Sequence, residues 1–175
     1  MRDDHQMNTP APPVEPVPLA QSLRDKSANS DLVLIVDDVP DNLAVLHDAL
    51  DESGYTVLIA TNGEQALQRA AQARPDIVLL DAMMPGIDGF EVARRLKADG
   101  MTAHIPIVFM TGLTETEHLV AALEAGGVDY VTKPIKPKEV LARMNVHLQG
   151  ARRARQVARQ ACLLYTSPSP RDRQK

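Results

Sequence analysis

The sequence predicts one α/β domain built on a parallel sheet, with additional segments at both ends. Between residues 32 and 160, short and almost continuously apolar runs alternate with longer amphipathic runs. Strands that are covered on both faces of a parallel sheet need such continuous apolar runs, and helices provide the cover. Five successive pairs of a strand and a helix therefore predict a doubly wound α/β domain with right-handed crossovers.

Each strand is expected where an apolar run is bounded by polar or turn residues. The expected strands are LVLIV (32–36), YTVLIA (55–60), IVLL (77–80), IPIVFM (105–110) and VDYV (128–131). The first expected helix begins at Pro40, because proline is favoured in a first helical turn, and stops at Gly54. The remaining helices are expected over the amphipathic runs 62–74, 89–100, 114–127 and 136–161.

The two ends of the chain fall outside this alternation. Residues 1–30 are rich in proline and lack helical or strand periodicity, so we expect a disordered leader. Residues 151–161 are rich in arginine and are expected to form a helical linker toward an output domain that the chain lacks. Residues 162–175 abandon the preceding pattern and resemble a translated sequencing adapter, which would make Ala161 the last native residue.

Composition narrows the classes of function. No stretch approaches the roughly 20 apolar residues of a membrane span, so we expect a cytoplasmic protein without membrane contact. The only cysteine, Cys162, lies in the suspected adapter, so we expect no disulfide or thiol chemistry. The formal net charge is −4, and an acidic domain is a poor ligand for nucleic acid. Nucleic acid is therefore expected as a partner only through a missing output domain.

Polar residues follow the expected strands at the edge where a parallel sheet binds its ligands. They are Asp37 and Asp38 after the first strand, Asp81 after the third, Thr111 after the fourth and Lys133 after the fifth. In a doubly wound sheet, ligands bind outside the carboxyl ends of the strands, where the strand order reverses. Three carboxylates, a hydroxyl and an ammonium group are therefore expected to converge at one edge.

Each of these residues also has an ordinary structural interpretation. Asp37 and Asp38 could cap the following helix, and Asp81 could begin a turn. Thr111 could likewise cap the next helix, and Lys133 could be a solvated lysine beside a proline. Taken singly, these interpretations are favoured, but five coincidences at one edge explain the pattern less well than a shared site.

Phosphoryl transfer assisted by a divalent cation suits this set of side chains. Clustered carboxylates raise one another's pKa unless a cation is present, and hard oxygen ligands with room for water favour Mg²⁺. An oxygen of Asp81 could then attack phosphorus, while Lys133 and the Thr111 hydroxyl stabilise the phosphoryl oxygens. We therefore predict Asp81, Thr111 and Lys133 as the catalytic residues, with Asp81 as the modified one.

Motifs over residues 32–150 resemble the receiver domain of bacterial two-component response regulators. They are LIVDD followed by Pro40 and Asn42, IVLLDAMMPGIDGFEVARRLK, IPIVFMTG and AGGVDYVTKPI. The resemblance implies a flavodoxin-like receiver domain at residues 31–150 with strand order 2-1-3-4-5. It also implies a phosphoryl group donated by a sensor histidine kinase or a phosphotransfer protein. Such a domain catalyses its own phosphorylation and dephosphorylation and is not an enzyme acting on a separate substrate.

The resemblance also assigns roles to individual residues. It implies that Asp81 is the phosphoacceptor and that Asp37, Asp38, Asp81 and the backbone carbonyl of Met83 hold Mg²⁺.

The same resemblance implies a conformational switch next to the phosphoacceptor. Thr111 and Lys133 would hold the phosphoryl group, and Tyr130 would be the aromatic switch that turns inward when Thr111 moves. The bond between Lys133 and Pro134 is expected to be cis. The face formed by the last two helices and the strand between them would then recruit a partner, with a homodimer as one candidate.

Two other classes share parts of this pattern. A phosphatase of the haloacid-dehalogenase type also uses an aspartyl nucleophile, but it needs Asp-x-Asp after its first strand, where this chain has adjacent Asp37 and Asp38. A flavodoxin-like cofactor-binding module would need glycine and backbone N–H groups where this chain has DDVPDN. For the whole protein, regulation of transcription is the favoured output by family analogy, with control of a cyclic-dinucleotide enzyme or a kinase module as alternatives.

Overall fold

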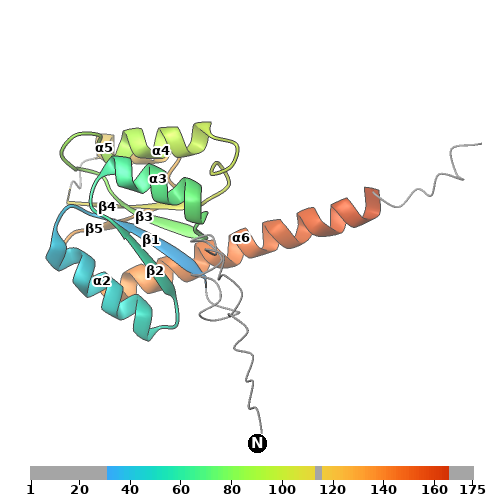
Figure 1. The fold of residues 1–175 in the computed structure, drawn as a ribbon, viewed down its shortest axis with the longest axis horizontal. Helices are drawn as coiled ribbons and strands as arrows, with labels where there is room; N and C mark the ends of the chain where they lie inside the picture. Colours follow the sequence, from blue (N-terminus) through green and yellow to red (C-terminus); the bar gives the residue numbers. More distant parts are fainter. Residues whose placement is uncertain (1–30, 113–115, 166–175) are drawn as a thin grey trace, which may run out of the picture.

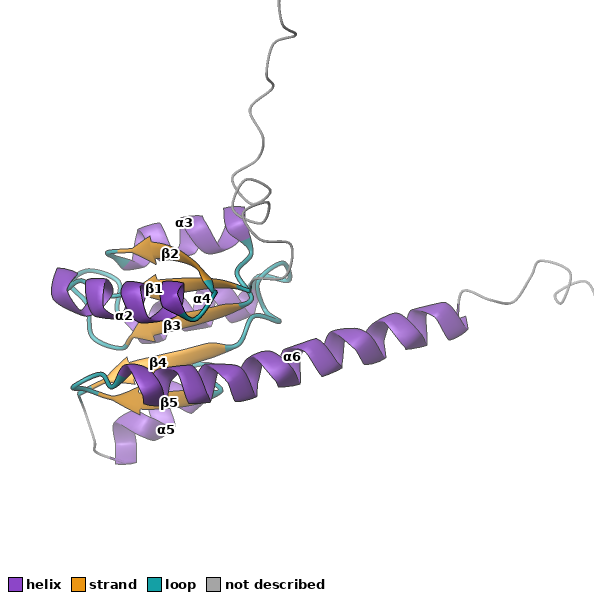
Figure 2. Ribbon diagram, turned by 90° about the horizontal axis from the view of Figure 1, so that it is seen from below, coloured by secondary structure: helices purple, strands orange, loops and turns teal. Residues whose placement is uncertain are grey.

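The structure, a computed structural model, describes residues 31–112 and 116–165. Helices cover both faces of a five-stranded parallel sheet (Figures 1 and 2). The strands are β1 (Leu32–Val36), β2 (Thr56–Ala60), β3 (Ile77–Asp81), β4 (Ile107–Thr111) and β5 (Asp129–Thr132). The helices are α2 (Pro40–Glu52), α3 (Gly63–Ala73), α4 (Gly89–Ala98), α5 (Thr116–Glu124) and α6 (Pro137–Tyr165).

The strand order is β2-β1-β3-β4-β5, and every neighbouring pair is parallel. This confirms the predicted fold class. The largest difference from the expected strands is at β4, which begins at Ile107 instead of Ile105. Pro106 precedes it and has no N–H for the ladder, although its carbonyl accepts a hydrogen bond from the backbone N–H of Val78 at 3.0 Å.

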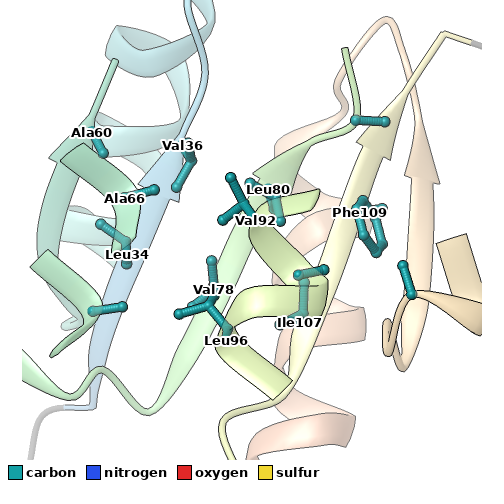
Figure 3. Packing of buried hydrophobic residues seen from close by; sticks show 14 of the residues in the cluster. Leu34, Val36, Ala60, Ala66, Val78, Leu80, Val92, Leu96, Ile107 and Phe109 are labelled. Carbon is teal, nitrogen blue, oxygen red and sulfur yellow. The ribbon is translucent and has the colours of Figure 1, made fainter. Parts of the chain in front are cut away.

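The apolar core lies in two layers, one on each face of the sheet. Successive side chains of a strand point to opposite faces, so Leu34 and Val36 enter one layer while Val33 and Ile35 enter the other. Helices α3, α4 and α5 cover the first layer, and Figure 3 shows its packing. Helices α2 and α6 cover the second. The continuous apolar runs are therefore explained by burial on both faces.

Helix α6 leaves the domain after its first three turns. Val140, Met144 and Leu148 are buried against the sheet, and the helix then projects away from the body (Figures 1 and 2). Residues 151–161 are helical, and α6 is described as far as Tyr165, four residues past Ala161. Residues 162–165 contain no proline, the residue that breaks a helix most strongly. None of the described helices has the length and apolar character of a membrane span.

Candidate functional site

The carboxyl ends of the strands bring the predicted polar residues to one edge of the sheet. β3 ends with Asp81 and β4 ends with Thr111, while Asp37 directly follows β1 and Lys133 directly follows β5. The backbone N–H of Lys133 donates to the carbonyl of Thr111 at 2.8 Å, which joins the ends of β4 and β5. Because β1, β3 and β4 are buried along their whole length, the core beneath them fixes the positions of Asp37, Asp81 and Thr111.

Lys133 lies between the two buried carboxylates. Its Nζ is 3.1 Å from Oδ2 of Asp81 and 3.6 Å from Oδ2 of Asp37. Asp37 is fully buried and Asp81 is 2% exposed. Two buried negative charges are costly unless a cation or hydrogen-bond donors accompany them. The single ammonium group of Lys133 therefore serves both carboxylates.

The pKa of Asp81 is raised from 3.8 to about 6, and burial is the largest cause. The ammonium group of Lys133 and the backbone N–H of Met83 lower this pKa, whereas the nearby charge of Asp37 raises it. That N–H donates to Oδ1 of Asp81 at 3.2 Å. Lys133 thus offsets only part of the cost of holding a buried negative charge, and a second cation would favour the ionised carboxylate.

Asp37, Asp38 and Asp81 form an acidic cluster that suits a divalent cation. One carboxylate oxygen from each lies within 4.8 Å of the others, and Asp38 is exposed while the other two are buried. All of the donors are hard oxygen atoms, and the exposed side leaves room for water, which is the environment that Mg²⁺ prefers. The carbonyl of Met83, assigned to the metal by the resemblance, belongs to the residue whose N–H already contacts Asp81. Its role as a ligand remains a prediction.

The residues predicted for the switch lie on β4 and β5. Thr111 is 4% exposed and pairs with Thr132 across the ladder. Tyr130 is half-buried, pairs with Phe109 and packs against the first core layer. The bond between Lys133 and Pro134 is cis, as expected. Whether Thr111 takes part in capping involves residues 113–115, which lie outside the described residues.

The start of α2 argues against the capping interpretation of the acidic pair. The N-cap residue is Val39, and no side chain caps the helix. Oδ1 of Asp37 instead accepts the backbone N–H of Val39 at 2.9 Å. Asn42, to which the motif gave no role, donates its Nδ2 to Oδ2 of Asp37 at 3.2 Å. The only signal for this contact in the sequence was its place in the third position of the expected helix.

Comparison with known proteins places this site in a family. Residues 33–145 match the response regulator receiver domain. The chain is 42% identical over 117 residues to the phosphate regulon transcriptional regulatory protein PhoB of Pseudomonas aeruginosa, covering 67% of this chain and 51% of PhoB. It is 43% identical over 117 residues to the DNA-binding response regulator MtrA of Mycolicibacterium smegmatis, covering 67% and 50%. The chain thus spans about half the length of these relatives.

Solved structures share the fold. A response regulator from Chloroflexus aurantiacus has a TM-score of 0.67 and 34% identity, covering 69% of this chain and 99% of that one. The receiver domain of a sensor histidine kinase from Pseudomonas aeruginosa, with magnesium coordinated in its active site cleft, has a TM-score of 0.65 and 29% identity. That match covers 69% of this chain and 98% of the other.

Proposed function

Because this chain belongs to the response regulator receiver domain family, we propose that it accepts a phosphoryl group on Asp81 in a phosphorelay. The observation that carries the proposal is the buried Asp81 carboxylate, held at the end of β3 by Lys133 and the N–H of Met83. Receiver domains of this family take their phosphoryl group from histidine kinases. We propose that a histidine kinase is likewise the phosphoryl donor of this chain.

In the proposed transfer, an oxygen of Asp81 attacks phosphorus while the bond from phosphorus to the donor's histidine nitrogen breaks. The lysine ammonium group, already 3.1 Å from Asp81, follows the charge onto the phosphoryl oxygens, and the Thr111 hydroxyl donates to another of them. Asp37, Asp38, Asp81 and the Met83 carbonyl would hold Mg²⁺, which supplies neutralising charge. Attack by water on the acyl phosphate returns phosphate and free Asp81.

The proposed switch runs from Thr111 through Tyr130 to α6. Inward movement of the Thr111 hydroxyl would leave space that Tyr130, now half-buried, can fill. The neighbouring Asp129 carboxylate binds α6, since Nη1 of Arg143 lies 2.9 Å and Nε2 of His147 lies 3.0 Å from its oxygens. A movement of β5 would therefore be transmitted to α6, the helix that projects from the domain, through these contacts.

Mass spectrometry of the intact protein tests the phosphoacceptor directly. Wild type incubated with acetyl phosphate and Mg²⁺ should gain the mass of one phosphoryl group, and the Asp81→Asn variant should gain none, because an amide oxygen is a poor nucleophile. Asp48→Asn, at an exposed position on α2, is the matched control and should label as wild type does. Labelling that persists in Asp81→Asn, or wild type that does not label, would refute the proposal.

We also propose that phosphorylation promotes a homodimer through the face formed by α5, β5 and α6. Val120 and Leu123 on α5 and Val128 just before β5 are exposed apolar residues, and apolar side chains gathered at a surface are typical of a contact. Leu123→Glu should abolish dimerisation of the phosphorylated chain, measured by sedimentation, because a charge would be buried at the contact. Val45→Glu on α2 replaces a residue with the same 51% exposure and should not. Dimers that survive Leu123→Glu would rule out this face.

For the whole protein we propose regulation of transcription. PhoB is named as a transcriptional regulator and MtrA as DNA-binding, and each is about twice the length matched here. The projecting α6 is suitably placed to connect the receiver domain to such an output domain. A gene that encodes a cyclic-dinucleotide enzyme or a kinase module after this receiver domain, and not a DNA-binding domain, would overturn this output.

A further inference from the structure

Asn42 contacts the acidic site from the first turn of α2. Its side chain is half-buried, and Nδ2 lies 3.2 Å from Oδ2 of Asp37. An ionised carboxylate can only accept hydrogen bonds, so the amide nitrogen of Asn42, and not its oxygen, must face Asp37. The contact is therefore a donated hydrogen bond to a carboxylate of the acidic cluster.

Asp37 depends on a small number of donors because it is fully buried. Oδ1 accepts the N–H of Val39 at 2.9 Å, while Oδ2 is shared by Asn42 at 3.2 Å and Nζ of Lys133 at 3.6 Å. Nζ of Lys133 is closer to Asp81, at 3.1 Å, and the negative charge of a phosphoryl group on Asp81 would attract it away from Asp37. Asn42 is then the donor that stays on Oδ2 of Asp37.

We propose that Asn42 is a positioning residue that fixes the Asp37 carboxylate for Mg²⁺ and for phosphoryl transfer, an inference that rests on the proposed function. Asparagine suits this role because it donates a hydrogen bond without adding a positive charge that would compete with the cation. Partners that orient metal ligands in this way typically contribute 10-fold to 100-fold to metal affinity.

The local structure leaves the Asn42 amide available for this task. A residue in the third position of a helix commonly reaches back to the N–H of the N-cap residue. In α2 the N-cap residue is Val39, and its N–H is already bonded to Asp37. The side chain of Asn42 therefore bonds to the acidic site and not to the N-cap residue, and its partner there is Asp37.

Calorimetric titration of the unphosphorylated chain with MgCl₂ tests the proposal. Asn42→Ala should weaken Mg²⁺ binding by about tenfold. Alanine is a better helix former than asparagine, so folding is not at risk from propensity. Asn145→Ala, at an exposed position of α6, makes the same chemical change and should leave the affinity unchanged. In labelling with acetyl phosphate, Asn42→Ala should need about tenfold more Mg²⁺ for half-maximal rate.

A second measurement separates positioning from a role in helix stability. The proposal expects Mg²⁺ to raise the unfolding temperature of Asn42→Ala less than that of wild type, because weaker binding gives less stabilisation at the same concentration. A variant with unchanged Mg²⁺ affinity, whose unfolding temperature falls equally with EDTA and with Mg²⁺, would overturn the proposal. Failure of the proposed function is distinct, because wild type would then bind Mg²⁺ without labelling Asp81.

Discussion

Gly89→Ala should destabilise the domain by about 3 kcal/mol and should displace the turn that follows the phosphoacceptor. A Cβ atom at this position would lie 2.1 Å from the carbonyl oxygen of Asp81 and 2.9 Å from Cα of Ala82. Both are backbone atoms, so no side-chain rotation can relieve the contact. The N–H of Gly89 also donates to the carbonyl of Ala82 at 3.0 Å, which holds the start of α4 against the end of β3.

Urea unfolding of both the variant and a matched control measures this effect. Gly100→Ala makes the same change after α4, where the added Cβ would meet nothing within 4 Å, and should alter stability by less than about 0.5 kcal/mol. Gly89→Ala should also slow labelling of Asp81, because the carbonyl that must move belongs to the phosphoacceptor itself. Equal unfolding midpoints for the two variants would show that the turn can rearrange to fit a Cβ atom at residue 89. The close approach of Gly89 to the carbonyl of Asp81 would then not be required for stability.

The fold was predictable because β1, β3 and β4 are buried along their whole length, and such burial leaves a continuous apolar run in the sequence. The edge strands β2 and β5 are mostly half-buried. The same topology explains why most of the candidate site could be predicted. Residues that follow parallel strands must meet at one edge, so Asp37, Asp81, Thr111 and Lys133 could be grouped from their positions alone. Predicting the site required the alternation of elements and no knowledge of side-chain geometry.

The details that could not be predicted depend on three-dimensional contacts between side chains and backbone. Asn42 was part of a motif, but its hydrogen bond to Asp37 depends on the exact start of α2 and on the direction of one amide. Gly89 was expected to begin a helix, yet its close approach to the carbonyl of Asp81 depends on how α4 starts against the end of β3. The balance between burial and Lys133 that sets the pKa of Asp81 likewise needs distances.

Asp81→Asn should stabilise the metal-free domain by about 2 to 3 kcal/mol near pH 7.5. Asp81 has a pKa of about 6 in the folded chain, against 3.8 as its ordinary value. The folded state therefore holds this proton more tightly than the unfolded state does. Wild type should lose stability as the pH rises from about 4 to 6, since ionising the buried carboxylate costs the folded state more. The amide of the variant carries no such charge.

Urea unfolding in EDTA at several pH values tests both the size and the sign of this effect. The difference in the free energy of unfolding between Asp81→Asn and wild type should be constant above pH 7. It should shrink as the pH falls toward 4, because the wild-type carboxyl group then becomes neutral as well. Asp48→Asn, at an exposed position, should show no comparable dependence. A difference that grows on acidification would contradict the raised pKa.

If the acidic cluster binds Mg²⁺, adding the cation should make wild type more stable than Asp81→Asn and so reverse their order of stability. A ligand that binds only the folded state stabilises it in proportion to the logarithm of its concentration over its dissociation constant. Asp81→Asn removes one of the three charged donors, so Mg²⁺ should stabilise wild type far more than the variant. Burial makes the ionised Asp81 unfavourable without a cation and receptive to one, so the same feature that destabilises the metal-free domain would favour metal binding. Equal stabilisation of both proteins by Mg²⁺ would show that Asp81 is not one of its ligands.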